Sequence, residues 1–183
     1  MGNIMGSDWS EVQNRWLALQ VRSGWEFLSS SCLRDRGYDV FCPTYLRRRK
    51  WSDRVKILQA PLFPGYLFVR FHSPNGQLII SVPGVMRFLC IDKRPIPIDD
   101  DEIRSLAISQ HAGLPCGPSP FLQIGQQVEI CEGPLSGLRG RVVRTKGKQR
   151  LVVSVTLLRK SVFVELDEYD VAPRPLSERS FEA

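Results

Sequence analysis

The chain has 183 residues, of which 43% are hydrophobic, and a formal net charge of +6. This length accommodates one medium domain or two small ones, and the basic balance suits a polyanionic partner. The five cysteines form no C-x-x-C pair and only two histidines are present, which excludes the usual zinc motifs. No apolar run approaches the roughly 20 residues of a membrane helix, and residues 1–14 lack the apolar core of a signal peptide. We expect residues 1–14 to be disordered, and the scattered thiols favour the reducing cytoplasm.

The first half of the chain predicts alternating strands and helices. The nearly continuous apolar run Trp16–Val21 is typical of a buried strand. Ser23 and Glu26 stand at the spacing of a capping box, and Gly37 is a suitable helix stop. Residues 24–36 are therefore expected to form a helix.

Two further strands follow, with a basic run between them. Strands are expected over residues 39–46 and 59–71, and the second is entered through two prolines. Residues 47–56 carry six cations against one acid, and they are expected to project as an exposed hairpin or loop. Like charges at this density repel one another unless a polyanion neutralises them, so the run predicts contact with phosphates. Trp51 within it either stacks on a base or is buried in a solvated loop.

The remaining elements of this part complete an α+β domain. We expect a short helix from Pro74 to about Ile80, a strand over residues 85–91 and a helix that begins near Asp99. The resulting order is strand, helix, strand, strand, helix, strand, helix. It predicts a ferredoxin-like sandwich with an antiparallel sheet over residues 15–111.

The last third of the chain has a different pattern. Residues 112–121 are rich in glycine and proline and are interpreted as an interdomain linker. Short valine-rich runs alternate with glycine and proline turns over residues 122–173, which predicts a small β-barrel rather than helices. Residues 174–183 are interpreted as a tail.

No catalytic or metal-binding pattern stands out. The sequence has no Ser/His/Asp order, no H-E-x-x-H and no phosphate-cradling glycine loop. The acidic cluster Asp99–Glu102 suits the positive end of a helix dipole, so it does not require a metal. We therefore expect a protein that is not an enzyme and that needs no cofactor or metal.

The segment Pro61–Val69 is the most unusual part of the chain. Phe63, Tyr66 and Phe68 place three rings within six positions, while Leu67 and Val69 make the opposite alternation apolar as well. A strand that is apolar on both faces needs a cover on both. The helices of a small domain cover one face, so the second domain or a partner protein is expected to cover the other.

Several segments together resemble the NusG family of transcription elongation factors. The resemblance is carried by Trp16, Pro61–Val69 and Ser81–Phe88 in the first domain, and by the KOW motif of Gly125–Gly140 in the second. It implies an NGN domain followed by an SH3-like KOW barrel. It also implies a monomeric, cytoplasmic factor without membrane contact, which binds RNA polymerase and suppresses pausing or termination.

The resemblance further implies which residues meet each partner. Contacts with the β′ clamp helices of RNA polymerase are expected from Ala18, Gln20, Phe63, Tyr66 and Phe68. Contacts with the β-subunit gate loop are expected from Asn75, Gly76 and Gln77. Contacts with the non-template DNA strand are expected from Arg22, Arg34, Arg47, Arg48, Arg49 and Lys50. In the barrel, the positions at which family members dock Rho or a small-subunit ribosomal protein hold Leu135, Leu157 and Leu158.

Some positions depart from the housekeeping pattern of the family. The basic segment Arg49–Arg54 resembles specialised paralogues of the UpxY and RfaH-like type, and Arg159 replaces a glycine that is usual in housekeeping members. The alternative interpretation is a ribosome-associated or RNA-binding KOW protein, which the basic segments would suit. The ring-rich strand favours a protein partner over that alternative.

Overall fold

The computed structural model describes residues 12–50, 55–72, 76–119, 126–131, 133–145, 148–166 and 173–175. Residue contacts divide the chain into two compact units, one of Met1–Cys42 and Phe63–Asp100 and one of Pro43–Leu62 and Asp101–Ala183. Within the described ranges, no helix is long and apolar enough to cross a membrane. The same ranges contain no group of three or more His, Cys, Asp or Glu side chains that could hold a metal ion.

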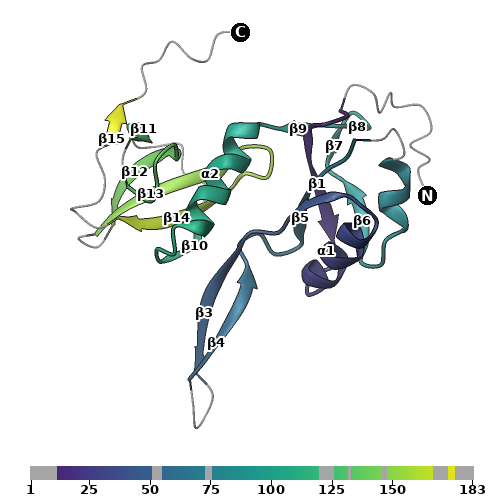
Figure 1. Ribbon diagram of the computed structural model, residues 1–183, viewed down its shortest axis with the longest axis horizontal. Coiled ribbons are helices and arrows are strands. Elements are labelled where there is room, and N and C mark those ends of the chain that lie inside the picture. Colours follow the sequence, from purple (N-terminus) through teal and green to yellow (C-terminus); the bar gives the residue numbers. More distant parts are fainter. Residues whose placement is uncertain are drawn as a thin grey trace. The chain divides into compact units, whose positions relative to one another are not determined.

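The first unit is built on a five-stranded antiparallel sheet (Figure 1). Its strands are β1 (Trp16–Val21), β2 (Asp39–Phe41), β5 (Tyr66–Arg70), β6 (Val85–Phe88) and β9 (Pro97–Ile98). They are ordered β2-β5-β1-β6, and β9 pairs with the start of β1. Two short strands, β7 (Cys90–Ile91) and β8 (Arg94–Pro95), pair separately.

One face of this sheet holds the hydrophobic core. Leu19 lies opposite Leu67 in the β1–β5 register, and both side chains are buried. Helix α1 (Glu26–Asp35) contributes Leu33 to this core, and the 3-10 helix η1 (Gly76–Ser81) contributes Ile79. Because neighbouring residues of a strand point to opposite faces, Ala18 and Phe68 lie on the other side of the sheet.

The structure confirms the first strand and the end of the first helix but corrects the helix start. Gly37 ends α1 with φ +81°, and its N–H donates to the Arg34 carbonyl at 2.8 Å. The capping box predicted at Ser23 is wrong, because the N-cap residue is Trp25 and makes no side-chain cap hydrogen bond. The predicted helix near Ile80 is present as the 3-10 helix η1.

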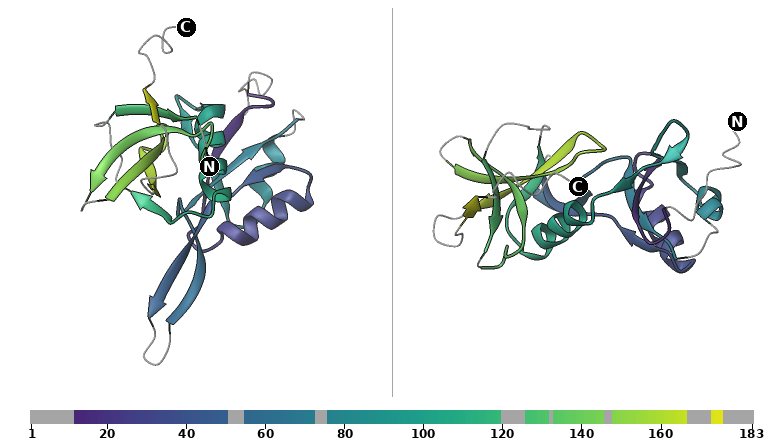
Figure 2. Two further views of the ribbon diagram at one scale, coloured as in Figure 1. Left: turned by 60° about the vertical axis from the view of Figure 1, so that its left-hand side comes forward. Right: turned by 90° about the horizontal axis from the view of Figure 1, so that it is seen from above.

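The second unit contains a hairpin, a helix and a six-stranded sheet. The hairpin pairs β3 (Thr44–Lys50) with β4 (Val55–Pro61), and the helix is α2 (Asp100–His111). The sheet strands are β10 (Cys116–Ser119), β11 (Gln126–Ile130), β12 (Arg139–Thr145), β13 (Lys148–Val155), β14 (Lys160–Leu166) and β15 (Pro173–Pro175). All neighbours in the order β10-β14-β13-β12-β11-β15 are antiparallel (Figure 2). The α+β class with a strand-rich second domain is confirmed.

The proline-rich segment interpreted as a linker contains a strand. Within residues 112–121, β10 pairs with β14, and Pro118 lies opposite Val162. β10 is an edge strand of the sheet, and an edge is where a strand tolerates a residue without an N–H. Prolines also divide the strand predicted over residues 39–46 at Pro43, and the one predicted over 59–71 at Pro64. The domain boundaries given above remain predictions.

Helix α2 lies against loops of the six-stranded sheet in the same unit. The Asp101 carboxylate forms an ion pair with Arg139 at 2.6 Å. The Thr156 hydroxyl donates to Glu102 at 2.6 Å, and the Arg139 backbone N–H donates to the Ser105 hydroxyl at 3.2 Å. These contacts fix the first turns of α2 next to the β11–β12 loop and the β13–β14 turn.

Candidate functional site

A tight turn positions the ring-rich segment. The Tyr66 N–H donates to the Phe63 carbonyl at 3.0 Å, and Gly65 sits inside the turn with φ +82°. The buried Glu26 carboxylate accepts the Gly65 N–H at 2.8 Å, while the Gly65 carbonyl accepts the Val21 N–H at 2.9 Å. The turn is therefore tied to both α1 and β1, and it delivers Tyr66 to the start of β5.

The rings gather on the face of the sheet opposite the core. Ala18 lies opposite Phe68, and Gln20 opposite Tyr66. Phe68 packs edge-on against Phe63 with ring centroids 5.5 Å apart, and tilted against Phe41 at 6.2 Å. We call this surface the aromatic face, and it consists of Trp16, Ala18, Gln20, Phe41, Phe63, Tyr66 and Phe68. It brings together all five residues expected to meet the clamp helices.

The residues of the aromatic face are buried to different extents. Phe63 is 1% exposed and Phe68 is 0% exposed, and Ala18 is equally buried. Gln20 and Tyr66 are half-buried, as are Trp16 and Phe41. Phe63 and Phe68 therefore expose almost no surface of their own to a partner, and their contact with the clamp helices stays a prediction. These two rings are the buried part of the face, and the half-buried residues form its accessible part.

Cationic side chains border the aromatic face. The Arg70 guanidinium lies over the Trp16 ring at 5.0 Å and pairs with Asp39 at 3.0 Å. On β6, the exposed Arg87 donates from Nε to the Gln20 side-chain oxygen at 2.7 Å. The arrangement suits a partner surface that combines apolar groups with carboxylates.

The structure describes the expected gate-loop and arginine contacts only in part. Asn75 lies outside the described residues, and Gly76 and Gln77 begin η1. Arg22 is exposed, with its guanidinium 5.8 Å from the Trp25 ring centroid. Arg34 is also exposed and donates to the Val40 carbonyl at 3.1 Å.

The other four residues expected to contact DNA share one strand. Arg47, Arg48, Arg49 and Lys50 occupy the outer part of β3, and Arg47 and Arg48 are exposed. Because β3 runs in regular register with β4, Arg47 and Arg48 lie on opposite faces of the hairpin. Trp51 lies outside the described residues.

The three leucines expected to dock a barrel partner differ in accessibility. Leu135, in the loop between β11 and β12, is only 1% exposed, so it is a packing residue rather than a surface contact. Leu157 and Leu158 lie in the turn between β13 and β14 and are half-buried. In the same turn, Arg159 adopts φ +49°, a conformation that favours glycine.

Burial affects the acidity of three of the cysteines, Cys42, Cys90 and Cys116. All five are free thiols. Burial raises the pKa of Cys42 to about 11, with a smaller contribution from the negative charge of Glu26. Burial likewise raises the pKa values of Cys90 and Cys116. These three thiols therefore stay protonated near neutral pH, whereas a nucleophile or metal ligand needs the thiolate.

The sequence is similar to those of known proteins. The sequence model described as "Transcription termination factor nusG" matches residues 14–107, which include both β1 and the ring-rich β5. The chain belongs to the NusG family of transcription termination and antitermination factors.

Individual members of the family resemble the chain over most of its length. The transcription termination/antitermination protein NusG of Escherichia coli strain K12 is 29% identical over 169 residues, covering 85% of this chain and 93% of that protein. NusG of Thermus thermophilus is 28% identical over 147 residues, covering 74% and 80%. A solved structure of domain interaction in Thermotoga maritima NusG matches at 22% identity with a TM-score of 0.47, covering 86% of this chain and 95% of that chain.

Sequence reasoning missed several members of these surfaces. Trp16 stands two residues before Ala18, so strand alternation could have placed it on the aromatic face. Phe41 and Arg87 reach this face only through the pairing of β2 with β5 and of β6 with β1. No local pattern shows that pairing, and for this reason the sequence did not point to these two residues.

Proposed function

We propose that this chain is a transcription elongation and antitermination factor that binds RNA polymerase through the aromatic face. The observation that carries the proposal is the face itself, on which the half-buried Gln20 and Tyr66 share one side of the sheet with the buried Phe68. The Arg87 guanidinium already holds the Gln20 side chain at 2.7 Å, so that less conformational entropy is lost there on binding. The bordering arginines favour an amphipathic, acidic partner, and the β′ clamp helices are the proposed one.

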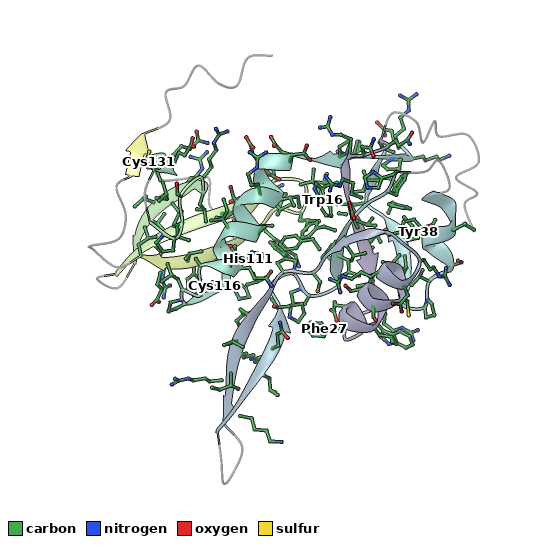
Figure 3. All side chains as sticks on the ribbon, in the orientation of Figure 1. Trp16, Phe27, Tyr38, His111, Cys116 and Cys131 are labelled. Atoms are coloured by element: carbon green, nitrogen blue, oxygen red, sulfur yellow. The ribbon has the colours of Figure 1, made fainter. Side chains whose placement is uncertain are left out.

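Capture of RNA polymerase by the immobilised full-length chain tests this assignment. Tyr66→Ala removes the half-exposed ring and is expected to weaken capture about tenfold or more, as for an interface anchor. Phe27→Ala is the matched control, because Phe27 is an exposed ring on α1, which packs on the core face (Figure 3). Equal capture by wild type and Tyr66→Ala would show that the aromatic face is not the polymerase-binding surface.

The finer contacts belong to the same proposal. Segment 75–77 meets the β-subunit gate loop, and Arg22, Arg34 and the basic residues of β3 approach the non-template DNA strand. Bridging the two sides of the polymerase would suppress pausing or termination. A single-round transcription assay on a template with a strong pause checks the sign of the effect, since the proposal expects a shorter pause dwell time.

The barrel is proposed to recruit a second protein through Leu157 and Leu158. Both leucines are half-buried in one turn, whereas the buried Leu135 supports the neighbouring loop. Rho or a small-subunit ribosomal protein is the proposed partner. Leu157→Ser should reduce binding to that partner and leave polymerase capture unchanged. Co-sedimentation with ribosomes but no capture of polymerase would instead favour the ribosome-associated alternative.

A further inference from the structure

The β3–β4 hairpin has an unusual surface for a paired ribbon. Its seven residue pairs run without interruption from Thr44 opposite Pro61 to Lys50 opposite Val55. At about 3.4 Å per residue, the seven-residue ribbon is roughly 24 Å long. Figure 1 and Figure 2 show no other element of the same unit layered on its outer half.

Exposed aliphatic side chains accompany the cations on this ribbon. Leu46 is 72% exposed, Ile57 is 60% exposed and Leu58 is 41% exposed. Single exposed aliphatic residues are common, but three within three consecutive residue pairs of one hairpin are not explained by solvation. A partner made of phosphate alone would give these side chains nothing to contact.

Both faces of the ribbon carry the same mixture. Leu46, Arg48 and Ile57 lie on one face, because Arg48 pairs with Ile57 and Leu46 is two residues from Arg48. Arg47 and Leu58 pair with each other and lie on the opposite face. A flat partner would cover one of these faces only. A groove with charged walls and an apolar floor can contact both.

The base of the ribbon is anchored, so the exposed part can act as an arm. Thr44 is buried, and its hydroxyl accepts a hydrogen bond from the Gln110 amide of α2 at 3.5 Å. The Leu62 N–H donates to the Pro43 carbonyl at 2.8 Å and closes the neck of the hairpin. An isolated hairpin is only marginally stable in water, and the contact with α2 holds the base of this one without covering its outer faces.

We propose that the β3–β4 ribbon is an arm that inserts into a groove of double-stranded B-form DNA. Arg47 and Arg48 contact phosphates on the two walls, and Leu46, Ile57 and Leu58 contact sugars and base edges. The major groove of B-DNA admits a two-stranded ribbon, whereas that of duplex RNA is too deep and narrow. The inference rests on the proposed contact of the basic residues of β3 with DNA, but it assigns them to a duplex in place of the single non-template strand.

Binding of the full-length chain to labelled nucleic acids, followed by fluorescence anisotropy, tests the inference. The probes are a 20-base-pair DNA duplex, its single strand and the same duplex in RNA, each titrated across a range of salt concentrations. The duplex DNA is expected to bind at least tenfold more tightly than either other probe. Equal or tighter binding of single-stranded DNA or of duplex RNA would overturn the inference.

Two paired variants separate the phosphate contacts from the groove contacts. Arg47→Ala/Arg48→Ala should lower the slope of log Kd against log salt concentration by about 2, at about 0.9 per lost phosphate contact. Leu46→Ser/Ile57→Ser should weaken binding about tenfold at every salt concentration and leave the slope unchanged. Met86→Ser, at an exposed apolar residue of β6, is the control and should bind as wild type does. Wild-type affinity in Leu46→Ser/Ile57→Ser would refute a role for the aliphatic residues.

DNA binding and polymerase capture together distinguish an error in the DNA-binding inference from an error in the proposed polymerase-binding surface. Leu46→Ser/Ile57→Ser should capture RNA polymerase as wild type does, because both residues belong to the β3–β4 ribbon and neither is part of the aromatic face. Tyr66→Ala should bind duplex DNA normally while losing polymerase. If Tyr66→Ala keeps both activities, the polymerase surface is wrong and the arm stands.

Discussion

The substitution Gly84→Ala tests how closely the turn at Gly84 packs against helix α1. The residue has φ +84°, and a Cβ atom added there would lie 2.5 Å from the Ser29 hydroxyl oxygen and 2.8 Å from the Trp25 Cβ. The Gly84 carbonyl also accepts the Arg22 N–H at 2.8 Å, which ties this turn to the end of β1. A side chain at Gly84 therefore meets α1 directly.

The expected loss of stability in Gly84→Ala has two parts. The left-handed backbone costs an alanine about 1–2 kcal/mol. The overlap with Ser29 and Trp25 adds about 1–3 kcal/mol, because these atoms belong to a packed helix and cannot withdraw freely. The free energy of unfolding should therefore fall by about 2–5 kcal/mol, a large part of the stability of a small domain.

Gly24 provides the matched control for this measurement. It has φ +85°, almost the same as Gly84, but nothing lies within 4 Å of an added Cβ. Gly24→Ala should therefore show the backbone cost alone. Urea titration followed by tryptophan fluorescence measures both variants. Equal destabilisation by the two substitutions would refute the steric part of the reasoning, and the close packing of this turn on α1 with it.

Three further substitutions and reactions check other parts of the structure. Glu26→Ala leaves the Gly65 N–H without its carboxylate acceptor and should lower the free energy of unfolding by about 1.5–3 kcal/mol in urea titration, with a smaller loss for Glu26→Gln. Arg159→Gly relieves a positive φ and should raise stability by about 0.5–1 kcal/mol; a lower melting temperature would contradict this. With its pKa raised to about 11, Cys42 should react with iodoacetamide at pH 8 about 100-fold more slowly than a thiol of pKa 9.0, and well after the exposed Cys131 in peptide mapping. The pKa of the Cys42 thiol is higher in the folded than in the unfolded chain. The contribution of Cys42 to the free energy of unfolding is therefore fully present below pH 9, and it is lost as the pH rises toward 11.

Local patterns in the sequence were sufficient for the elements whose causes are local. The apolar run of β1 and the glycine after α1 predicted their positions, because strand burial and a left-handed helix end depend on adjacent residues. The capping box failed for the opposite reason. Glu26 has a hydrogen-bond partner, Gly65, that is far away in the sequence, and no spacing rule reveals such a contact.

The sequence predicted most of the residues that make up the candidate site but not how deeply each of them is buried. Alternation placed Tyr66 and Phe68 on one face, and β1 pairs with β5 in the register that adds Gln20 and Ala18. The burial of Phe68 depends on Phe41 and Phe63 packing around it, which follows from tertiary contacts alone. In the hairpin, the sequence drew attention to the cations, and the exposure of Leu46 became visible only with the paired strands.

The pairing of β10 with β14 constrains the order in which the chain assembles during synthesis. Cys116 leaves the ribosome well before Val164, its partner in the sheet, whereas β12, β13 and β14 form a meander of neighbouring hairpins. Closing the longer loop carries the greater entropic cost, so we expect the meander to form first and β10 to dock last. Until β10 docks, the edge of β14 has no paired strand. Strand exchange between neighbouring nascent chains is therefore most favoured during this time.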